Sequence, residues 1–535
     1  MTDHKNIKPF VASFLIVLGI FIGKYLNFGG VDDGQGMSMY NPQTKFNQLV
    51  NQVKNNYVDD VDIDSLLDKT MLQFLEELDP HSTYISIDEM QSVSENMQGN
   101  FDGIGIEYQI YNDTLVVVNA ITDGPSEKIG IKAGDRIIRV DTIQVAGVGL
   151  KNSDVVKKLR GKSGTEVEVE VLRYGMSKPM VFDIVRGKIP LHSMDVAYMV
   201  NDEIGYIKIN RFSATTYEEF YKGLTSLKEQ GATSLILDLR GNPGGYLNAA
   251  HKMVDEFLDD GKMIVYTSGK SRPKREYTAT SEGEFKKGDV VVIVDESSAS
   301  ASEIVAGALQ DNDRGTIVGR RTFGKGLVQE QWEMYDGSAL RLTTSRYYTP
   351  TGRSIQKSYA NGIDAYRHES LTRYDNGELY NMDSVKLVDS LKFVTPKGKI
   401  VYGGGGIMPD IFVPLDTAGR SMWLYDILAQ NIINDISFTY ADKHRETLKE
   451  TYNPKSFAID FEISEQLFDD LLALANSKEI EQKDDEVLYS KAFVQSRLKS
   501  LIARKLWGGD GFYRVLNQFD NDVLKAVQLL QEPTD

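Results

Sequence analysis

The chain has 535 residues, no cysteine and only 6 histidines, so it cannot hold disulfides, thiolate metal sites or a cysteine nucleophile. Its formal net charge of −17 at pH 7 argues against general nucleic-acid binding, which needs a basic surface. The length predicts several domains, and any chemistry must depend on serine, lysine, carboxylate or backbone groups. We therefore expect no metal and no cofactor.

The N-terminal segment reads as a membrane anchor. Residues 10–23 are uncharged and follow basic residues, and counted on to Leu26 they make roughly 26 Å of helix, just enough to cross a bilayer. Residues 25–28 are too bulky for a good signal-peptidase site, which favours an uncleaved signal anchor over 1–28. A cleaved signal peptide and a buried soluble helix are the alternatives. The leading basic residues place the body of the protein in the cell envelope, on the periplasmic or extracytoplasmic side of the inner membrane.

Two short regions follow the anchor. Residues 29–39 are rich in Gly, Asp and Ser and predict a flexible linker. Within 40–98 the apolar residues recur at helical spacing, which predicts a helical region whose second helix is ended by Asp79-Pro80. The two stripes are Phe46, Leu49, Val50, Val53 and Tyr57, and then Leu67, Met71, Phe74, Leu75 and Leu78.

Residues 99–188 contain short strand-like runs between Gly-rich turns. Gly103-Ile104-Gly105-Ile106 alternates glycine with isoleucine, so that its amides can converge on a carboxylate. A Gly-Asp-x-Ile turn, a helix near 153–159 and a strand over 167–173 come next. This order resembles a PDZ domain, and the resemblance implies that Gly103, Ile104, Gly105 and Ile106 bind the free carboxylate of a C-terminal peptide. Taken alone, the four residues could form a simple β-turn, and the domain could either recruit substrate or gate access.

The remainder predicts an α/β core and a helical extension. Over 189–413 strand-like runs alternate with helical ones, which is typical of a parallel sheet. The strands are expected at 204–209, 234–239, 290–294 and 316–318, and the helices at 215–230, 247–258 and 301–309. Residues 414–535 read as a helical extension with Leu/Ile stripes at 420–436, 462–475 and 488–505. These helices could cap the core, form a homo-oligomer or bind an adaptor, and the stripes suggest a homo-oligomer.

Serines at 298, 300 and 302 lie where a buried strand passes into a helix. Amides at a helix N-terminus stabilise developing negative charge, so this position suits a nucleophile. No histidine belongs to a recognisable triad motif, but Lys325 stands between two glycines and could act as the base once it is desolvated. Taken separately, the serines could be an ordinary helix cap and the lysine a surface turn residue.

The segments 298–303 (Ser-Ala-Ser-Ala-Ser-Glu) and 323–329 (Phe-Gly-Lys-Gly-Leu-Val-Gln) closely resemble the signature of the carboxy-terminal processing peptidases, or tail-specific proteases. The resemblance extends over about residues 40–413. It implies a crotonase-like α/β protease core with an inserted PDZ domain, within a multidomain α/β chain with helical N- and C-terminal regions. It also implies a catalytic Ser300, Lys325 and Gln329, the last orienting the lysine. Gly245, in preference to Gly244, and Ala301 would supply the oxyanion-hole amides.

The leading hypothesis is a serine endopeptidase that cleaves exported proteins near their C-termini, engaging protein or peptide substrates through those termini. The alternative from another class is a catalytically silent PDZ adaptor or scaffold on a protease fold. A crotonase-like acyl-transfer enzyme is a third interpretation, but it would require coenzyme binding, which the PDZ-like module makes improbable.

Overall fold

The computed structural model describes residues 41–173, 175–386 and 388–532, and the chain divides into two compact units after Thr70. The expected signal anchor at 1–28 and the expected linker at 29–39 lie outside the described residues. Within the described ranges we find no helix with the length and apolar character needed to cross a membrane.

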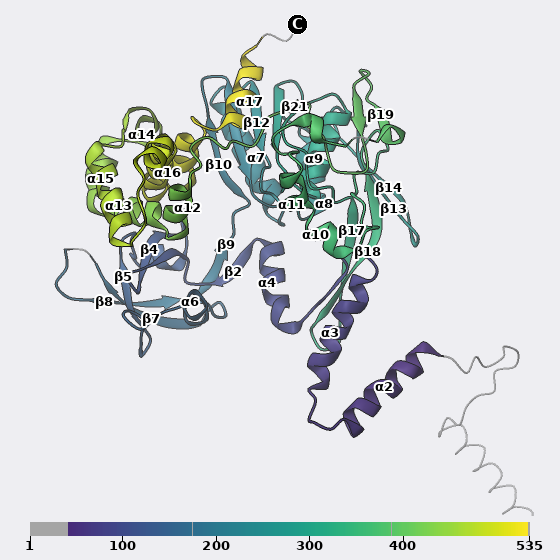
Figure 1. Cartoon of the computed structure of the whole chain (residues 1–535), viewed down its shortest axis with the longest axis horizontal. Coiled ribbons are helices and arrows are strands. Elements are labelled where there is room, and N and C mark those ends of the chain that lie inside the picture. The colour runs from purple at the N-terminus through teal and green to yellow at the C-terminus, as the bar shows by residue number, and fades with distance from the viewer. Residues whose placement is uncertain (1–40, 174, 387, 533–535) are drawn as a thin grey trace, which may run out of the picture. The chain divides into compact units, whose positions relative to one another are not determined.

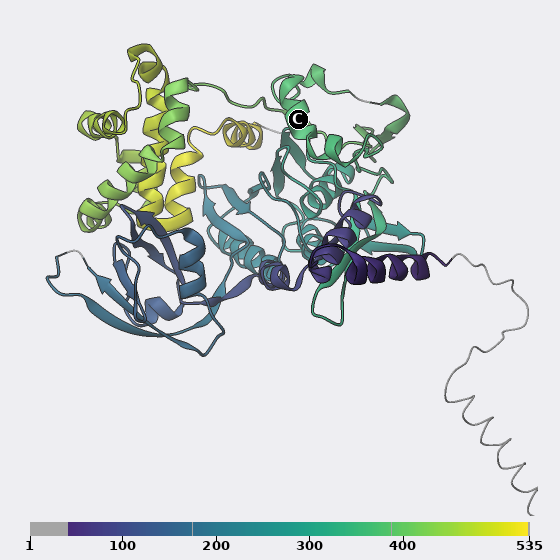
Figure 2. The ribbon, with the colours of Figure 1, turned by 60° about the horizontal axis from the view of Figure 1, so that its bottom comes forward.

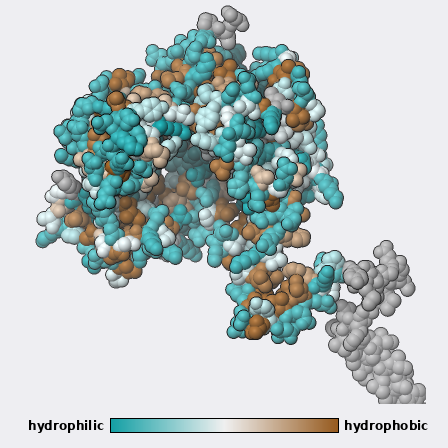
Figure 3. Space-filling model, viewed as in Figure 1, coloured by the Kyte–Doolittle hydropathy of each residue, from teal (hydrophilic) through white to brown (hydrophobic). Residues whose placement is uncertain are grey.

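The described part of the first unit is helical, as its apolar spacing predicts. The helix α2 (Pro42–Asn56) begins at Asn41, whose side chain accepts a hydrogen bond from the amide of Gln43 at 3.0 Å. No residue of α2 is buried, and its apolar stripe is exposed, with Leu49 at 59%. Figure 3 shows apolar side chains gathered on this part of the surface. The next helix, α3 (Ile63–Glu76), crosses the boundary between the units and ends before Leu78, which the stripe had included.

A strand and a helix lead into the PDZ region, where the predicted β-rich domain is present (Figure 1). The elements are β1 (Thr83–Ile85), α4 (Ile87–Gln98), β2 (Asn100–Gly103), β3 (Ile106–Tyr111), β4 (Thr114–Ala120), α5 (Pro125–Lys128), β5 (Arg136–Val140), β6 (Ile143–Gln144), α6 (Asn152–Leu159), β7 (Glu166–Leu172), β8 (Met180–Val185) and β9 (Gly187–Pro190). The sheet runs β3-β4-β5-β7-β8 with β6 beside β5, so β3 is an edge strand. Val167, Val169 and Val171 are buried because alternate residues of a strand face the same side.

The α/β core follows the predicted alternation of strands and helices. Its elements are β10 (Met194–Met199), β11 (Ile204–Ile209), α7 (Thr216–Glu229), β12 (Ser234–Asp238), α8 (Leu247–Asp255), β13 (Met263–Gly269), β14 (Arg272–Thr278), β15 (Asp289–Val294), α9 (Ala301–Asp311), β16 (Thr316–Gly319), β17 (Leu327–Glu333), β18 (Ala339–Tyr348), α10 (Ile363–Arg367), α11 (Glu369–Asp375), η1 (Met382–Ser384), η2 (Asp389–Leu391), β19 (Lys392–Val394), β20 (Ile400–Tyr402) and β21 (Ile411–Phe412). One sheet runs β10-β11-β12-β15-β16-β21 and is parallel from β11 onward. A second, antiparallel sheet joins β1, β18, β13 and β14, with β17 paired to β18.

The parallel sheet is buried on both faces, which explains why its strands are nearly continuous apolar runs. Leu235, Leu237 and Val292 face a core shared with α7, α8 and α9. Ile236 and Val291, which alternate with them, face a second core on the other side. Two apolar layers therefore hold the carboxyl ends of β12 and β15 in place.

The C-terminal extension is helical, as predicted. Its helices are α12 (Met422–Ala429), α13 (Ile432–Thr451), α14 (Pro454–Asp460), α15 (Glu465–Ser477), α16 (Asp484–Leu516) and α17 (Asn521–Gln531). The predicted stripe at 420–436 is split between two helices, because Asn431 adopts the left-handed conformation (φ 60°) between them. Leu424, Ile427, Leu498 and Ile502 pack into an internal core of the extension. This core takes up one side of the stripes, whereas Met422, Leu428 and Leu488 remain exposed, so an oligomer or adaptor surface stays a prediction.

The helical extension packs against the PDZ sheet. Asn434 on α13 and Lys505 on α16 donate hydrogen bonds to the side-chain carbonyl of Gln109 on β3, at 3.0 and 3.1 Å. Figures 1 and 2 both show the C-terminal helices beside the strands of this domain. Tyr108, a neighbour of Gln109 on β3, packs instead against the PDZ core. The extension therefore contacts one face of β3, and the PDZ core occupies the other.

Candidate active site

Ser300 stands at the sharp turn between β15 and α9. Its backbone (φ 55°, ψ −110°) is in a region that side chains other than glycine rarely adopt. Neighbouring bonds hold the turn: the Ala299 amide donates to the Asn242 carbonyl at 3.0 Å, and the Ser298 hydroxyl donates to the Leu239 carbonyl at 2.9 Å. Such strain persists only where the surrounding structure imposes it, so the turn presents Ser300 in one defined orientation.

Glu303 connects this turn to the loop that carries Lys325. Its carboxylate is fully buried and accepts hydrogen bonds from the amides of Ser300 and Lys325, both at 2.8 Å, and of Gly324 at 2.7 Å. The Thr322 hydroxyl also donates to it. Burial raises the pKa of Glu303, although these hydrogen bonds oppose the shift. The sequence pattern indicates no separate role for Glu303, whose one local signal is its place in the serine segment, three residues into a helix.

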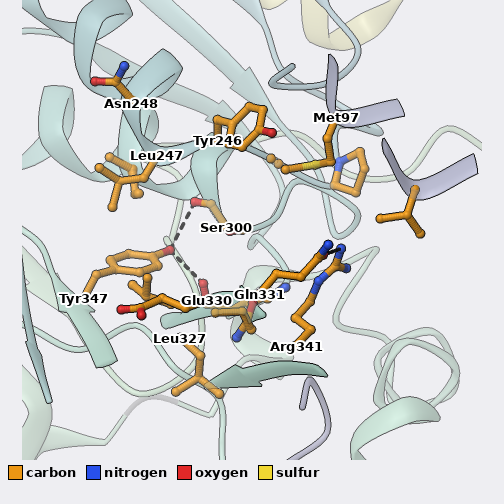
Figure 4. A pocket seen from close by; sticks show the side chains of 18 of the residues that line it. Met97, Tyr246, Leu247, Asn248, Ser300, Leu327, Glu330, Gln331, Arg341 and Tyr347 are labelled. Atoms are coloured by element: carbon orange, nitrogen blue, oxygen red, sulfur yellow. Dashed lines mark hydrogen bonds between the residues drawn. The ribbon is translucent and has the colours of Figure 1, made fainter. Parts of the chain in front are cut away.

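The lysine loop is tightly packed. Gly324 has a φ of +91°, and a side chain there would come within 3.1 Å of Gly406 and Lys357. The Tyr347 hydroxyl donates a hydrogen bond to the Lys325 carbonyl at 2.8 Å and lies 3.1 Å from the Ser300 carbonyl (Figure 4). Tyr347 is therefore a second link between serine and lysine that sequence reasoning missed.

Lys325 is held in conditions that favour its neutral form. Burial lowers its pKa, the nearby guanidinium of Arg341 lowers it further, and the negative charges of Glu303 and Asp79 oppose the shift. An amine whose pKa is lowered can accept a proton nearer neutral pH, as a general base must.

One cavity contains both residues. Its volume is about 760 Å³, and Ser300, Lys325 and Arg341 all line it (Figure 4). Apolar side chains supply much of the remaining wall, including Met90, Val93 and Met97 from α4, Leu247 from α8, and Leu327 from β17. Among the described residues no hydrogen bond joins the Ser300 hydroxyl to the Lys325 amine. The cavity therefore brings the two groups together within a wall of both apolar and polar side chains.

The backbone amides next to Ser300 differ in whether they donate a hydrogen bond. The amide of Gly244 donates to the Asn242 side chain at 2.8 Å. Within the described part of the chain, the amides of Gly245 and Ala301 donate to no acceptor. A side chain at Gly244 would lie 2.8 Å from the Ser300 Cβ, so the loop over residues 239–245, here called the glycine loop, approaches the serine closely. Two free N–H groups are thus available near the Ser300 hydroxyl.

Gln329 lines the same cavity but is bonded elsewhere. Its side-chain amide donates to the Thr343 hydroxyl at 3.2 Å, and that hydroxyl donates to Asp79 at 3.0 Å. Asp79 also accepts hydrogen bonds from Ser82, and these bonds lower its pKa although burial opposes them. No hydrogen bond of the described residues joins Gln329 to Lys325. The Asp79-Pro80-His81-Ser82 segment therefore supports the strand beside the lysine.

None of the five histidines in the described part of the chain lines the cavity or bonds to Ser300. His81 is influenced by the charge of Lys325: burial and this charge lower the pKa of His81 to about 4. Its ring nitrogen instead lies 2.8 Å from the hydroxyl of Tyr366. Lys325, in contrast, lines the cavity together with Ser300.

The PDZ loop lies between β2 and β3. Gly105 has a φ of +76°, and Ile104 is buried with its carbonyl accepting from the Ser126 amide at 3.0 Å. The amides of Ile104 and Gly105 donate to no acceptor among the described residues. Gly103 ends one strand and Ile106 begins the next, so the loop places these two amides beside the edge strand β3.

Three family models match the chain. The model for peptidase family S41 matches residues 203–365, and a PDZ domain model matches residues 103–181. A family of unknown function, DUF8443, matches residues 423–508, within the helical extension. The chain is therefore a serine-type peptidase that contains a PDZ domain.

Curated relatives narrow this class. The carboxy-terminal-processing protease of Bartonella bacilliformis is 34% identical over 346 residues, which cover 64% of this chain and 79% of the relative. The carboxy-terminal processing protease CtpA of Bacillus subtilis is 37% identical over 316 residues, covering 58% of this chain and 66% of the relative. The chain belongs to the carboxy-terminal processing protease family. A solved photosystem II D1 C-terminal processing protease is 25% identical, with 70% of this chain and 93% of that chain covered and a TM-score of 0.35.

Proposed function

We propose that this chain hydrolyses peptide bonds near the C-termini of protein substrates, with Ser300 as nucleophile and Lys325 as general base. The observation that carries the proposal is that both side chains line one cavity while Glu303 bonds to the backbone of both. The family membership and the PDZ domain favour this function over a silent adaptor.

The proposed reaction begins when the Ser300 hydroxyl attacks the scissile carbonyl and neutral Lys325 takes its proton. The amides of Gly245 and Ala301, which have no other acceptor in the described chain, would stabilise the oxyanion. Each such donor is worth roughly 10² to 10³ in kcat. Lys325 then returns the proton to the leaving amine, and an acyl-enzyme on Ser300 forms. Water activated by Lys325 resolves that ester.

Gln329 is proposed to orient the lysine amine. Its amide nitrogen is engaged by Thr343, which leaves its carbonyl oxygen available to accept a hydrogen bond from Lys325. Replacement by Glu would put a negative charge beside the lysine and favour its protonated form, so the amide suits a neutral base.

The PDZ domain is proposed to bind the substrate C-terminus as an added strand. The edge position of β3 and the free amides of Ile104 and Gly105 support this mode, in which the loop receives the carboxylate. The same binding event could recruit the substrate or gate access to the cavity. A peptide with an amidated C-terminus separates these roles: recruitment alone raises its KM, whereas gating also lowers its kcat.

Two further proposals concern the rest of the chain. The parallel strands and intervening helices of the core support a crotonase-like arrangement. The apolar, uncharged residues 10–23 support an inner-membrane anchor with the peptidase on the extracytoplasmic side. Membrane fractionation would test the location, and a mature chain beginning after residue 28 would show cleavage instead.

The deciding experiment compares wild type with Ser300→Ala and Lys325→Ala on unstructured peptides, with products identified by mass spectrometry. In wild type we expect mass spectrometry to detect an acyl-enzyme on Ser300. In both variants we expect turnover to fall by at least about 10³-fold. Equal cleavage by Ser300→Ala would eliminate the proposed nucleophile. A folded wild-type protein that binds C-terminal peptides without cutting them would favour the adaptor.

A further inference from the structure

The last helix of the chain forms part of the catalytic domain's packing. Residues 509–532 lie outside all three matched family models. Yet α17 lies against β12, β15 and β16, with Val523 and Ala526 buried in the core on that face of the sheet. Just before it, the Tyr513 hydroxyl donates to Asp195 on β10 at 2.7 Å. The end of the extension is therefore fastened to the sheet that carries the site.

Two aspartates at the start of α17 form ion pairs with Arg240 of the glycine loop. Arg240 donates to both carboxylate oxygens of Asp520 at 2.9 Å and to Asp522 at 2.9 Å. It also pairs with Asp238, at 2.6 Å. The Arg240 side chain is only 17% exposed and that of Asp522 only 8%, so these charges are largely removed from water. Arg320 lies 3.5 Å from Asp522 and adds a second cation.

Arg240 lies near the start of the loop that follows β12 and ends at Gly245. Its carbonyl accepts a hydrogen bond from Lys208, and the next amide, of Gly241, donates to Asp295 at 2.9 Å. Asn242 then donates to the Ile209 carbonyl at 3.0 Å. These bonds attach Arg240, Gly241 and Asn242 to neighbouring elements as one segment. A shift of Arg240 large enough to disturb this segment would also move Gly245, which follows in the same loop.

The C-terminal end of the glycine loop is also closely packed. The Gly244 Cα faces the Ser300 Cβ and the Ala301 amide, both 2.8 Å from where a side chain would begin. An oxyanion hole needs its donors within about 0.5 Å of the productive geometry. A small movement of the loop therefore weakens oxyanion binding before it affects the rest of the cavity.

We propose that Asp520 and Asp522 are positioning residues for the oxyanion hole: they fix Arg240, and through it the amide of Gly245, more than 270 residues away in the sequence. Because that hole belongs to the proposed hydrolase site, this role stands on the proposed function. The start of α17 then contributes to catalysis indirectly, through the position of Arg240, in addition to its packing against the sheet.

The test uses the full chain with Asp520→Asn, Asp522→Asn and both together, assayed on a peptide substrate. We expect kcat of the double variant to fall about tenfold to a hundredfold with KM within about twofold. The inhibition constant of a peptide aldehyde, whose adduct places an oxyanion in the same hole, should rise by a similar factor. Asp510→Asn is the matched control, because its ion pair with Arg514 stays within α16, and it should retain wild-type kinetics.

A folded double variant with wild-type kcat and aldehyde affinity would overturn the positioning role. So would a rise in KM alone, since that would place the residues in substrate binding. If the double variant does not fold, the single Asp520→Asn decides by the same two readouts. An inactive wild-type protein would instead overturn the proposed function itself, so the two failures are distinct.

Discussion

Glu303 accepts a hydrogen bond from the amide of Lys325 at 2.8 Å, and the same carboxylate oxygen accepts one from the amide of Ser300. A single buried side chain thus sets the spacing between the backbones of the proposed nucleophile and the proposed base. Such an arrangement is sensitive to any change in the hydrogen-bonding character of that side chain, because an unsatisfied buried donor costs about 1–3 kcal/mol.

We expect Glu303→Gln to lower kcat about tenfold to a hundredfold and the free energy of unfolding by about 1–3 kcal/mol. The glutamine keeps the shape, but its NH2 group would face N–H donors where an oxygen now accepts. Peptide hydrolysis and urea unfolding measure the two effects. Glu465→Gln is the control, since Glu465 is exposed in the first turn of α15. Unchanged kinetics in a stable Glu303→Gln protein would contradict the linking role.

Gly245→Ala should abolish activity and destabilise the protein. Gly245 has a φ of +146°, and a Cβ there would overlap the carbonyl oxygen of Phe212. The loop would have to move, and with it the proposed oxyanion donor. Gly241→Ala in the same loop is the matched control, because its Cβ would meet nothing within 4 Å and only its φ of +67° is unfavourable. We expect a cost of about 1 kcal/mol there and most of the activity retained. Thermal unfolding and kcat for both variants check the contrast.

Arg341→Gln should change the pH dependence of hydrolysis. The positive charge of Arg341 lowers the pKa of Lys325, so its removal raises that pKa. Because the proposed mechanism uses the neutral lysine, the rise of kcat/KM with pH should move to higher pH. We expect several-fold lower activity near pH 7 and near wild-type activity in alkaline buffer.

The control for this profile is Arg367→Gln, whose exposed guanidinium pairs with Glu76. It should leave the pH profile unchanged. A shift of the Arg341→Gln profile to lower pH would contradict the electrostatic role, because the loss of a nearby cation cannot favour the neutral amine.

His81 should make the protein less stable in mild acid. Burial and the charge of Lys325 lower its pKa to about 4, from 6.5 in the unfolded chain. Between these two values the unfolded state binds more protons, so the free energy of unfolding falls as the pH drops through this window. The expected loss is about 2–3 kcal/mol.

Denaturant unfolding at pH 7 and pH 4.5 measures this loss, and His81→Gln should reduce the difference between the two conditions. His368→Gln, at an exposed position, should behave as wild type. An equal loss in wild type and His81→Gln would assign the acid sensitivity to other groups.

Much of the secondary structure is predictable from the sequence because the local spacing of apolar residues indicates it. Leu235, Leu237 and their neighbours form a continuous apolar run, and such runs between helical patterns indicate a parallel sheet buried on both faces. The stripe at 420–436 does not show where one helix ends and the next begins, because a residue such as Asn431 in the left-handed conformation leaves little mark on the hydrophobic pattern.

By itself, the sequence determined the family, the strand-to-helix turn that carries Ser300 and the glycine-flanked Lys325, because residue type and short spacing encode them. Only the tertiary structure decided what holds these groups. It revealed that Glu303 joins the two loops, that the Gly244 amide is occupied while that of Gly245 is free, and that Asp520 and Asp522 reach Arg240. Contacts between residues so distant in the chain follow from how the layers pack, and packing imposes no local period that a sequence alone could reveal.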